Sequence, residues 1–268
     1  MSLFTSHTRC NPRPSRLWPQ ANALLLTLAT LLCLIPAAQA QSSPPAGPPT
    51  EPQLRIEAGM HTSVIRSISS DASGRYAVTA SDDKTARVWD VTTGRLLQVL
   101  RPPIAAGDEG KLYATSMAPN GETVAVAGWT KLGSSTGHTV YLFDRSTGQL
   151  RQRLTGLPSV INHLAHSPDG RWLVATLGDS NGIRVWPLAA TGIAPQPGSP
   201  LADGDYGGAS YGASFHASGL LATTSLDGQV RLYRLPGSSG PNTSTATTLR
   251  PLAQVRAPGG QQPFSVAF

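Results

Sequence analysis

A repeated pattern of turns and aromatic residues constrains the fold of this 268-residue chain more than any other feature. Four segments of the sequence share one order of strand-like and turn-like stretches. Their turn glycines, which we expect at positive φ, lie 47, 49 and 49 residues apart at Gly74, Gly121, Gly170 and Gly219. Each segment carries an aromatic residue further on, at Trp89, Phe143, Trp186 and Tyr233. The chain therefore contains four similar units.

Each unit is predicted to form four short antiparallel strands, because turn signals recur about every 8 to 12 residues. Charged residues make up 13% of the chain, which argues against a coiled coil or a long helical protein. Repeats of about 40 to 50 residues with four strands each are typical of β-propeller blades. We expect an all-β fold, a β-propeller of four-stranded antiparallel blades that forms an incomplete ring. The expected blades cover about 60–101, 111–155, 159–202 and 210–257, and the first strand of a fifth covers 263–268.

Two stretches of the sequence resemble a known repeat family. "TASDDKTARVWD" at Thr79–Asp90 resembles the signature of the WD-repeat family, and "SPDGRWLVAT" at Ser167–Thr176 is similar to the inner hairpin of that family. The resemblance is strongest in the first unit, since only Trp89 is followed by the Asp of the family's Trp-Asp pair. It implies a propeller fold and a protein-binding role.

The resemblance also implies a structural chain of hydrogen bonds in the first unit. It would run from the indole N–H of Trp89 through Thr79 and His61 to Asp83, and it would pair four polar groups that are costly to bury alone. In the fourth unit, Thr223 and Asp227 hold the matching positions before Tyr233, but no His does. The other blades are expected to be held by apolar packing.

The first forty residues have the pattern of a secretory signal peptide. Three arginines precede the apolar run "ALLLTLATLLCLIPAA", and "AQA" ends at a predicted cleavage site after Ala40. The alternative is an uncleaved membrane anchor, but the run is shorter than the roughly 20 residues that a bilayer span needs. We expect a secreted or periplasmic protein, with a Pro-rich linker over 41–53 and a folded domain from Leu54.

Loss of this segment changes the cysteine count and the charge. Both cysteines, Cys10 and Cys33, lie in it, so no disulfide is expected in the mature chain. Leu32 is bulky where a lipoprotein signal needs Gly or Ala, which argues against a lipid anchor. The net charge falls from +6 to +3, with 18 basic and 15 acidic residues left. Because the basic residues are scattered, we expect no nucleic-acid partner.

Two groups of residues look catalytic or metal-binding, yet both have a structural interpretation. His61, Thr79 and Asp83 suggest a catalytic triad, but the resemblance places the hydroxyl on an inner strand rather than at an exposed site. His163 and His166 suggest a zinc site. Residues three apart on a strand point to opposite faces, so these imidazoles cannot converge on one metal ion.

A third group, "DGDYGG" from Asp203, resembles a calcium loop, but Ser214 stands where the loop requires Glu. Phosphate-binding glycine loops, nucleophile elbows and zinc helices do not occur in the sequence. We therefore expect no enzyme activity, no cofactor and no metal. Asn242 begins a formal glycosylation acceptor.

Two insertions provide candidate partner-binding residues. "GWTKLGSSTGH" at Gly128–His138 lengthens the turn between the second and third strands of unit two, and in the WD-repeat family such turns lie on the face most used for partners. An exposed Trp is enriched at interfaces, so Trp129 and Lys131 are the first candidates. A second insertion, Thr191–Gly208, could add Asp205 and Tyr206 to the same face.

These patterns favour a secreted, non-catalytic scaffold that binds another protein or peptide. One alternative is the N-terminal regulatory or substrate-selecting propeller of a longer caspase-like peptidase, since the "NGIRV…SLDGQVRLY" core resembles propellers at one end of such bacterial proteins. Another is a lactonase-type propeller enzyme, but the metal-ligating carboxylates that it requires do not form a set in this sequence.

The last residues, "PFSVAF", align with Ile161–His166 and Ser210–Phe215, which are predicted innermost strands. We therefore expect the sequence to be part of a longer propeller of about seven blades. The stretch Gln53–Ala58 is expected to pair on the outside of the last blade, as the resemblance implies.

Overall fold

The computed structural model describes residues 59–268 except 134, 190–199, 237–247 and 261. These residues belong to one compact unit, Pro45–Phe268. The predicted signal peptide, the linker, the strand Gln53–Ala58 and the acceptor Asn242 lie outside the described residues. Over the ranges that are described, the chain contains no helix long and apolar enough to cross a membrane.

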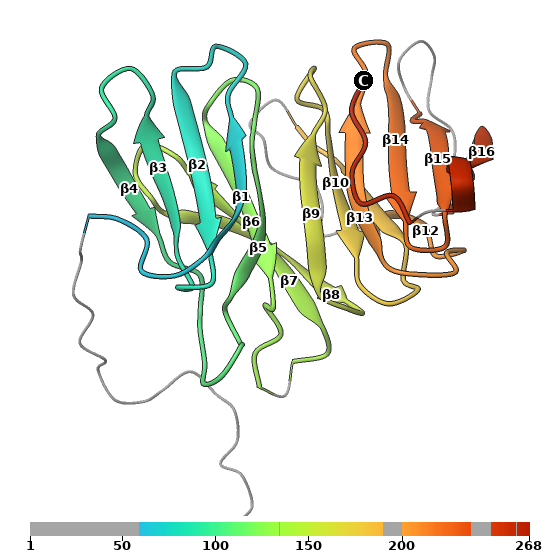
Figure 1. Ribbon diagram of the computed structural model, residues 1–268. Coiled ribbons are helices and arrows are strands. Elements are labelled where there is room, and N and C mark those ends of the chain that lie inside the picture. The colour runs from blue at the N-terminus through green and yellow to red at the C-terminus, as the bar shows by residue number, and fades with distance from the viewer. Residues whose placement is uncertain (1–58, 134, 190–199, 237–247, 261) are drawn as a thin grey trace, which may run out of the picture. The chain divides into compact units, whose positions relative to one another are not determined.

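The described residues form four antiparallel sheets of four strands each, which confirms the predicted propeller blades (Figure 1). Blade 1 consists of β1 (Ile65–Ser70), β2 (Tyr76–Ser81), β3 (Ala86–Asp90) and β4 (Leu96–Leu100). Blade 2 consists of β5 (Leu112–Met117), β6 (Thr123–Gly128), β7 (His138–Asp144) and β8 (Leu150–Leu157). Blade 3 consists of β9 (Ile161–His166), β10 (Trp172–Leu177), β11 (Ile183–Pro187) and β12 (Leu201–Asp203). Blade 4 consists of β13 (Ser210–Phe215), β14 (Leu220–Ser225), β15 (Gln229–Arg234) and β16 (Ala253–Arg256), and a 3₁₀ turn, η1 (Pro258–Gly260), follows it.

The repeated glycines close the turn between the first two strands of each blade. Gly74, Gly121, Gly170 and Gly219 have φ of 68°, 71°, 71° and 81°, which confirms the predicted positive values. In blade 1 the amide of Gly74 donates to the carbonyl of Asp71 at 3.2 Å. A side chain at these positions would be strained, because L-residues avoid this region.

The hydrophobic cores lie between neighbouring blades, because each sheet buries both faces of its middle strands. The innermost strands β1, β5, β9 and β13 lie side by side in that order (Figure 1). One core combines Val88 of blade 1 with Phe143 of blade 2. The next combines Leu142 of blade 2 with Trp186 of blade 3, and a third combines Val185 of blade 3 with Tyr233 of blade 4. Three of the four repeated aromatic residues, Phe143, Trp186 and Tyr233, are thus parts of these cores.

Side chains connect the innermost strands of neighbouring blades. The Ser67 hydroxyl on β1 accepts a hydrogen bond from the amide of Thr115 on β5 at 3.3 Å. The Ser69 hydroxyl accepts one from the amide of Met117 at 3.0 Å. The hydroxyl of Ser116 on β5 accepts the amide of His166 on β9 at 2.9 Å. The Asn162 amide group on β9 donates to the carbonyl of Ser210 on β13 at 3.0 Å. Polar groups of the innermost strands are therefore paired across blades as well as within them.

The predicted first strand of a fifth blade is not formed as a strand, although its residues lie where that strand belongs. Residues 262–268 have no regular secondary structure. They run beside β13 (Figure 1), and the rings of Tyr211 and Phe264 are 5.3 Å apart.

Candidate functional site

A chain of buried hydrogen bonds joins the loop before β1 to the middle of blade 1. The Trp89 indole N–H donates to the Thr79 hydroxyl at 2.9 Å, and this hydroxyl lies 2.8 Å from His61 Nε2. His61 Nδ1 lies 2.8 Å from an Asp83 carboxylate oxygen. The side chains of His61 and Asp83 are only 3% and 6% exposed. The four side chains occur in the order that the resemblance implies.

This geometry fits the structural role that the resemblance implies for Thr79 and His61. Because the Thr79 hydroxyl accepts the indole proton, it can donate its own proton to Nε2, which leaves Nδ1 to donate to the carboxylate. Burial alone would raise the pKa of Asp83, but hydrogen bonds from Thr85 and His61 outweigh it and lower the pKa. Thr79 is 9% exposed, and its hydroxyl is held between the Trp89 indole and the His61 ring.

Replacement of Asp83 by alanine should destabilise the domain by about 2 kcal/mol or more, because His61 would lose its acceptor inside the protein. The matched control is Asp108→Ala, since that carboxylate is 62% exposed and pairs with Lys111 on the surface. The control should leave the unfolding free energy close to that of wild type, because exposed ion pairs are screened by water. Urea unfolding measures both values. If Asp83→Ala lost no more unfolding free energy than Asp108→Ala, the structural interpretation would be wrong.

Tyr206 completes an equivalent network in blade 4, where the sequence shows no His. Its hydroxyl lies 2.7 Å from the Thr223 hydroxyl and 2.9 Å from the Tyr233 hydroxyl. The Tyr233 hydroxyl in turn donates to a carboxylate oxygen of Asp203 at 2.8 Å. Burial raises the pKa of Tyr206 to about 12, so the phenol stays protonated.

The prediction that Tyr206 binds a partner is therefore wrong, because the residue is 4% exposed and its hydroxyl contacts Thr223 and Tyr233 inside the blade. The signal that identifies its role is spacing. Tyr206 precedes Thr223 by 17 residues, and His61 precedes Thr79 by 18. A large polar aromatic side chain can span the same distance as an imidazole, so a search for His alone misses it.

An ion pair lies beside this network. A guanidinium nitrogen of Arg231 lies 2.6 Å from a carboxylate oxygen of Asp227, with side chains 5% and 12% exposed. The guanidinium also donates to the Ser225 hydroxyl and the Asp205 carbonyl, and its carbon lies 3.9 Å from the centre of the Tyr206 ring. Burial alone would raise the pKa of Asp227, but the bonds from Arg231 and Ser225 hold it well below its usual range.

The two other groups that resemble metal sites are used in structural contacts. The His166 ring lies 2.9 Å from Ser116 on β5, whereas the His163 ring hydrogen-bonds the backbone of Ala213 on β13. The two imidazoles thus point toward different blades. Asp203 is buried, and its carboxylate accepts hydrogen bonds from the Tyr233 hydroxyl and the Asp205 amide. Across the part of the chain that the structure describes, no three His, Cys, Asp or Glu side chains form a metal-binding group.

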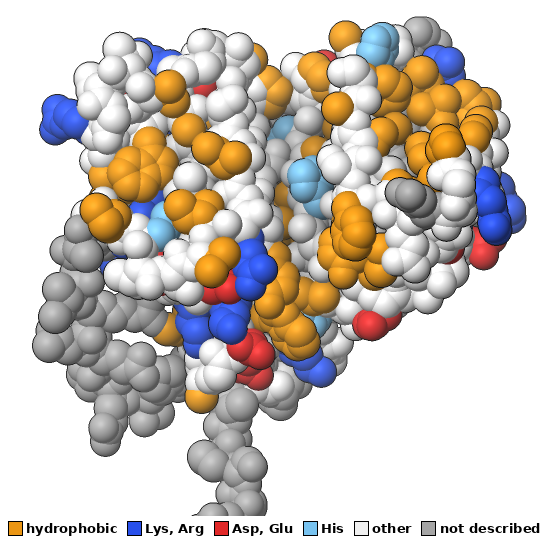
Figure 2. All heavy atoms as spheres, in the orientation of Figure 1, with side chains coloured by type: hydrophobic (Ala, Val, Ile, Leu, Met, Phe, Trp, Pro, Cys, Tyr) orange, Lys and Arg blue, Asp and Glu red, His pale blue; other side chains and the backbone are white. Residues whose placement is uncertain are grey.

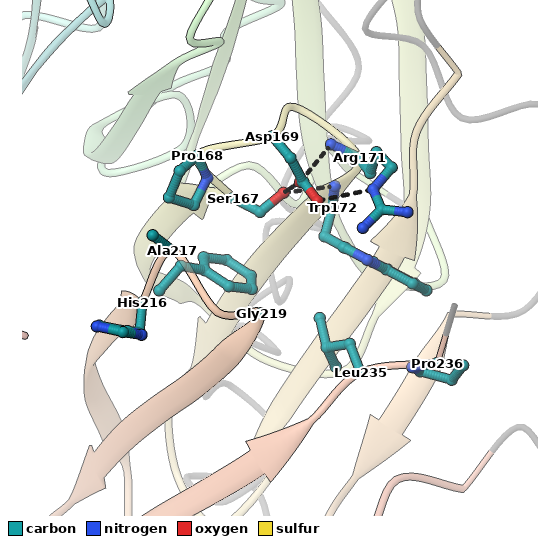
Figure 3. Close-up of a pocket in the computed structure, with 11 residues that line it drawn as sticks. Ser167, Pro168, Asp169, Arg171, Trp172, His216, Ala217, Gly219, Leu235 and Pro236 are labelled. Carbon is teal, nitrogen blue, oxygen red and sulfur yellow. Dashed lines mark hydrogen bonds and ion pairs between the residues drawn. The ribbon is translucent and has the colours of Figure 1, made fainter. Parts of the chain in front are cut away.

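Hollows open among the turns that connect first and second strands. One, of about 390 Å³, is bounded by β1, β5 and β9, and histidine side chains are visible in the hollow beside β9 (Figure 2). A much smaller one lies between blades 3 and 4, where Asp169 and Arg171 stand beside Trp172 and face Leu235 (Figure 3). Its volume of about 20 Å³ has room for roughly one water molecule.

Trp129 is the exposed aromatic residue on the turn between β6 and β7. It is 40% exposed, and its ring meets the buried His138 ring edge-on at 5.9 Å. Its backbone is fixed, since its amide donates to Lys111 and its carbonyl accepts from Gly110. Lys131 and Asp205 are also exposed. Trp129 is therefore a fixed aromatic surface group, which a partner could cover without reordering the loop.

A family model described as "WD domain, G-beta repeat" matches residues 56–90 and 148–187. Two segments of this chain are therefore similar to WD repeats. The first matched segment ends at the close of β3, with the Trp89-Asp90 pair. The second begins in the turn before β8 and ends with β11, so it contains the outer strand of blade 2 and three strands of blade 3. The sequence repeat is thus offset from the structural blade.

Curated relatives also share parts of the chain. It is 28% identical over 142 residues to "Nuclear distribution protein nudF 2" of Penicillium rubens, which covers 49% of this chain and 30% of the relative. It is 32% identical over 137 residues to "TBC1 domain family member 31" of Mus musculus, covering 50% and 12%. It is 28% identical over 88 residues to a "Ribosome biogenesis protein BOP1 homolog" of Drosophila ananassae, covering 33% and 10%. The chain spans less than a third of each of these relatives.

Proposed function

We propose that this protein is a non-catalytic interaction scaffold that is exported from the cell and binds another protein or peptide. WD repeats support a protein-binding role, and the names of the relatives refer to processes as different as nuclear distribution and ribosome biogenesis. Such variety favours a binding platform over one reaction. The export proposal rests on the basic and apolar pattern of residues 1–40.

The observation that supports this function most directly is the exposed indole of Trp129. Aromatic side chains that are rigidly held and partly exposed contribute most to protein interfaces. The Trp129 ring packs on His138, whose pKa is lowered by burial, so the contact is between neutral rings. Lys131 adds a positive charge on the same turn. A partner with an apolar pocket beside an acidic group would fit this pair.

The test is the Trp129→Ala variant in capture experiments from the exported fraction. We expect partner binding to weaken at least tenfold, because a central aromatic residue typically contributes about 2 kcal/mol or more. The melting temperature should stay within about 2 °C of wild type, as expected for a surface change. Mass spectrometry of the same preparation should show a mature N-terminus at Gln41.

The matched control is Leu97→Ala, since Leu97 is 38% exposed on β4 of another blade. It should leave partner capture unchanged. Equal losses of capture in both variants would show that Trp129 has no special role. A large drop in melting temperature for Trp129→Ala alone would show that the indole serves packing instead.

A further inference from the structure

We propose that the hollow bounded by β1, β5 and β9 (the inner hollow) binds the ammonium group of an alkyl amine, with the Asp71 carboxylate as its counterion. The hollow measures about 390 Å³, within the range typical of small-ligand sites. Its walls come from the ends of three neighbouring innermost strands and from the turns that follow them in blades 1, 2 and 3. Trp129 does not line it, so this site is separate from the proposed partner contact.

Asp71 sets the charge of the inner hollow. It is the one Asp, Glu, Lys or Arg among the described residues that line the hollow, and it is 7% exposed. The Tyr76 amide donates to one carboxylate oxygen at 2.9 Å, and the Ser73 hydroxyl donates to the other. Burial alone would raise the pKa of Asp71, but these hydrogen bonds outweigh burial and lower the pKa. The carboxylate is therefore ionised at neutral pH.

The negative charge of Asp71 has no basic partner inside the protein. None of the ion pairs that the described residues form includes Asp71. By contrast, the carboxylates of Asp144 and Asp227 pair with Arg151 and Arg231. A buried charge costs less free energy when an opposite charge lies beside it. A cation that entered the inner hollow would supply that opposite charge.

The two histidines that line the inner hollow do not repel a cation. Burial lowers the pKa of His163, and it lowers the pKa of His166 to about 4. His166 Nδ1 lies 2.9 Å from the Ser116 hydroxyl, but Nε2 is buried without a hydrogen-bond partner among the described residues. A second proton on this ring would have no acceptor, so burial favours the neutral form. The hollow therefore keeps its negative charge at neutral pH.

An ammonium group fits this site better than a metal ion or a guanidinium does. A metal ion needs several ligands, and no three His, Cys, Asp or Glu side chains in the described part of the chain form a metal-binding group. A guanidinium pairs best with both oxygens of a free carboxylate, but each Asp71 oxygen already accepts one hydrogen bond. An ammonium ion is a compact charge, for which one remaining lone pair is sufficient.

The rim of the inner hollow suits the alkyl chain of such an amine. Pro119 and Pro168, from the turns of blades 2 and 3, line the hollow and are partly or fully exposed. Met117 and Leu164 lie deeper and are buried. Alkyl amines cover apolar surface with their methylene groups while the charged head contacts polar groups. The ligand class is therefore a primary alkyl amine, either free or as a lysine side chain of another protein.

Titration of the isotopically labelled chain with n-butylamine, followed by NMR, tests the proposal. The backbone amides of Ala72, Thr115 and His163 should shift and saturate with a dissociation constant of about 1 mM, as expected for so small a ligand. The neutral analogue n-butanol should cause no saturable shifts at these amides. Equal shifts with the alcohol, saturable shifts only at other residues, or no shifts at about 10 mM amine would each overturn the proposal.

Two variants test the role of the charge. Asp71→Asn keeps an oxygen that accepts from the Tyr76 amide but removes the charge, so butylamine binding should weaken at least tenfold. Ser70→Lys serves where that variant does not fold, because a tethered ammonium at the exposed Ser70 should compete with the amine to the same extent. Wild-type affinity in folded Asp71→Asn, or in Ser70→Lys, contradicts the ammonium site.

The matched control is Asp169→Asn in the corresponding turn of blade 3. The Asp169 carboxylate already pairs with Arg171 and does not line the inner hollow, so this variant should bind butylamine like wild type. An equal loss in both asparagine variants would show that Asp71 has no special role. Trp129→Ala should also leave amine binding unchanged, whether or not Trp129 contacts a partner. Loss of amine binding in Trp129→Ala would place the amine on the indole and overturn the proposal.

A short peptide, acetyl-Gly-Lys-Gly-amide, separates the two sources of the amine. Binding that is at least tenfold tighter for the peptide than for butylamine supports the site and identifies a lysine side chain of another protein as its ligand. Tighter binding of butylamine supports the site and identifies a free amine. Acetylation of the peptide lysine removes its charge and should abolish binding. Equal binding of the acetylated peptide would show that no ammonium group is recognised.

Discussion

The Asp227→Ala variant is expected to lose about 3 to 5 kcal/mol of unfolding free energy, because removing one partner leaves a buried charge unpaired. Arg231 would stay in its position between Tyr206 and Ser225 with its side chain 5% exposed. Chemical denaturation at neutral pH measures the loss. The melting temperature should fall by several degrees for each kcal/mol in a domain of this size.

Two further variants separate the buried charge from a general effect of mutation. The double replacement Asp227→Leu with Arg231→Met removes both charges and should be less destabilising than Asp227→Ala alone. Asp169→Ala breaks an ion pair with Arg171 whose side chains are 42% and 51% exposed, so it should cost about 1 kcal/mol or less. Equal losses at Asp227 and Asp169 would show that burial of the Arg231 pair contributes nothing.

Acidification from pH 6.5 to pH 4 should remove roughly 3 kcal/mol of stability through His166, since each pKa unit corresponds to about 1.4 kcal/mol. Burial lowers the pKa of His166 from 6.5 to about 4. The unfolded chain therefore binds the proton more readily than the folded chain does. The contribution is fully present above pH 6.5 and is lost as the pH falls toward 4.

The His166→Asn variant isolates this effect, because asparagine can still accept the Ser116 hydroxyl and does not titrate. Its stability should depend less on pH between 6.5 and 4 than that of wild type. His163, whose pKa burial also lowers, remains in both proteins. Asp71 lines the same hollow, and its lowered pKa confines its effect to pH below about 3.8. Parallel stability curves for wild type and variant would contradict the role of His166.

The repeat made most of the fold predictable from sequence. Glycines with positive φ and aromatic residues recur at fixed spacing, and backbone sterics and core packing impose both. The network of blade 1 was predictable because its residues follow a family pattern. Tyr206 was missed because a phenol there replaces an imidazole, and chemical substitution of that kind leaves only the spacing as a signal.

The C-terminal segment shows a different limit. The alternation of "PFSVAF" predicts a strand and also predicts where the segment lies, but strand formation depends on a partner that local sequence does not supply. The solvent exposure of Trp129 also depends on its surroundings, since packing on His138 determines how much of the indole remains in contact with water. Local pattern fixes position in a repeat, whereas pairing and exposure are properties of the surroundings.

The location of the cores between blades has a consequence for how this protein unfolds. Each sheet buries its apolar residues against its neighbours, as Val88 does with Phe143 and Leu142 with Trp186. If blade 2 or blade 3 opened alone, it would expose the halves of two cores at once. The cooperative unit is therefore the interface between two blades, and energetic damage to one sheet spreads to the next as it does along a one-dimensional array.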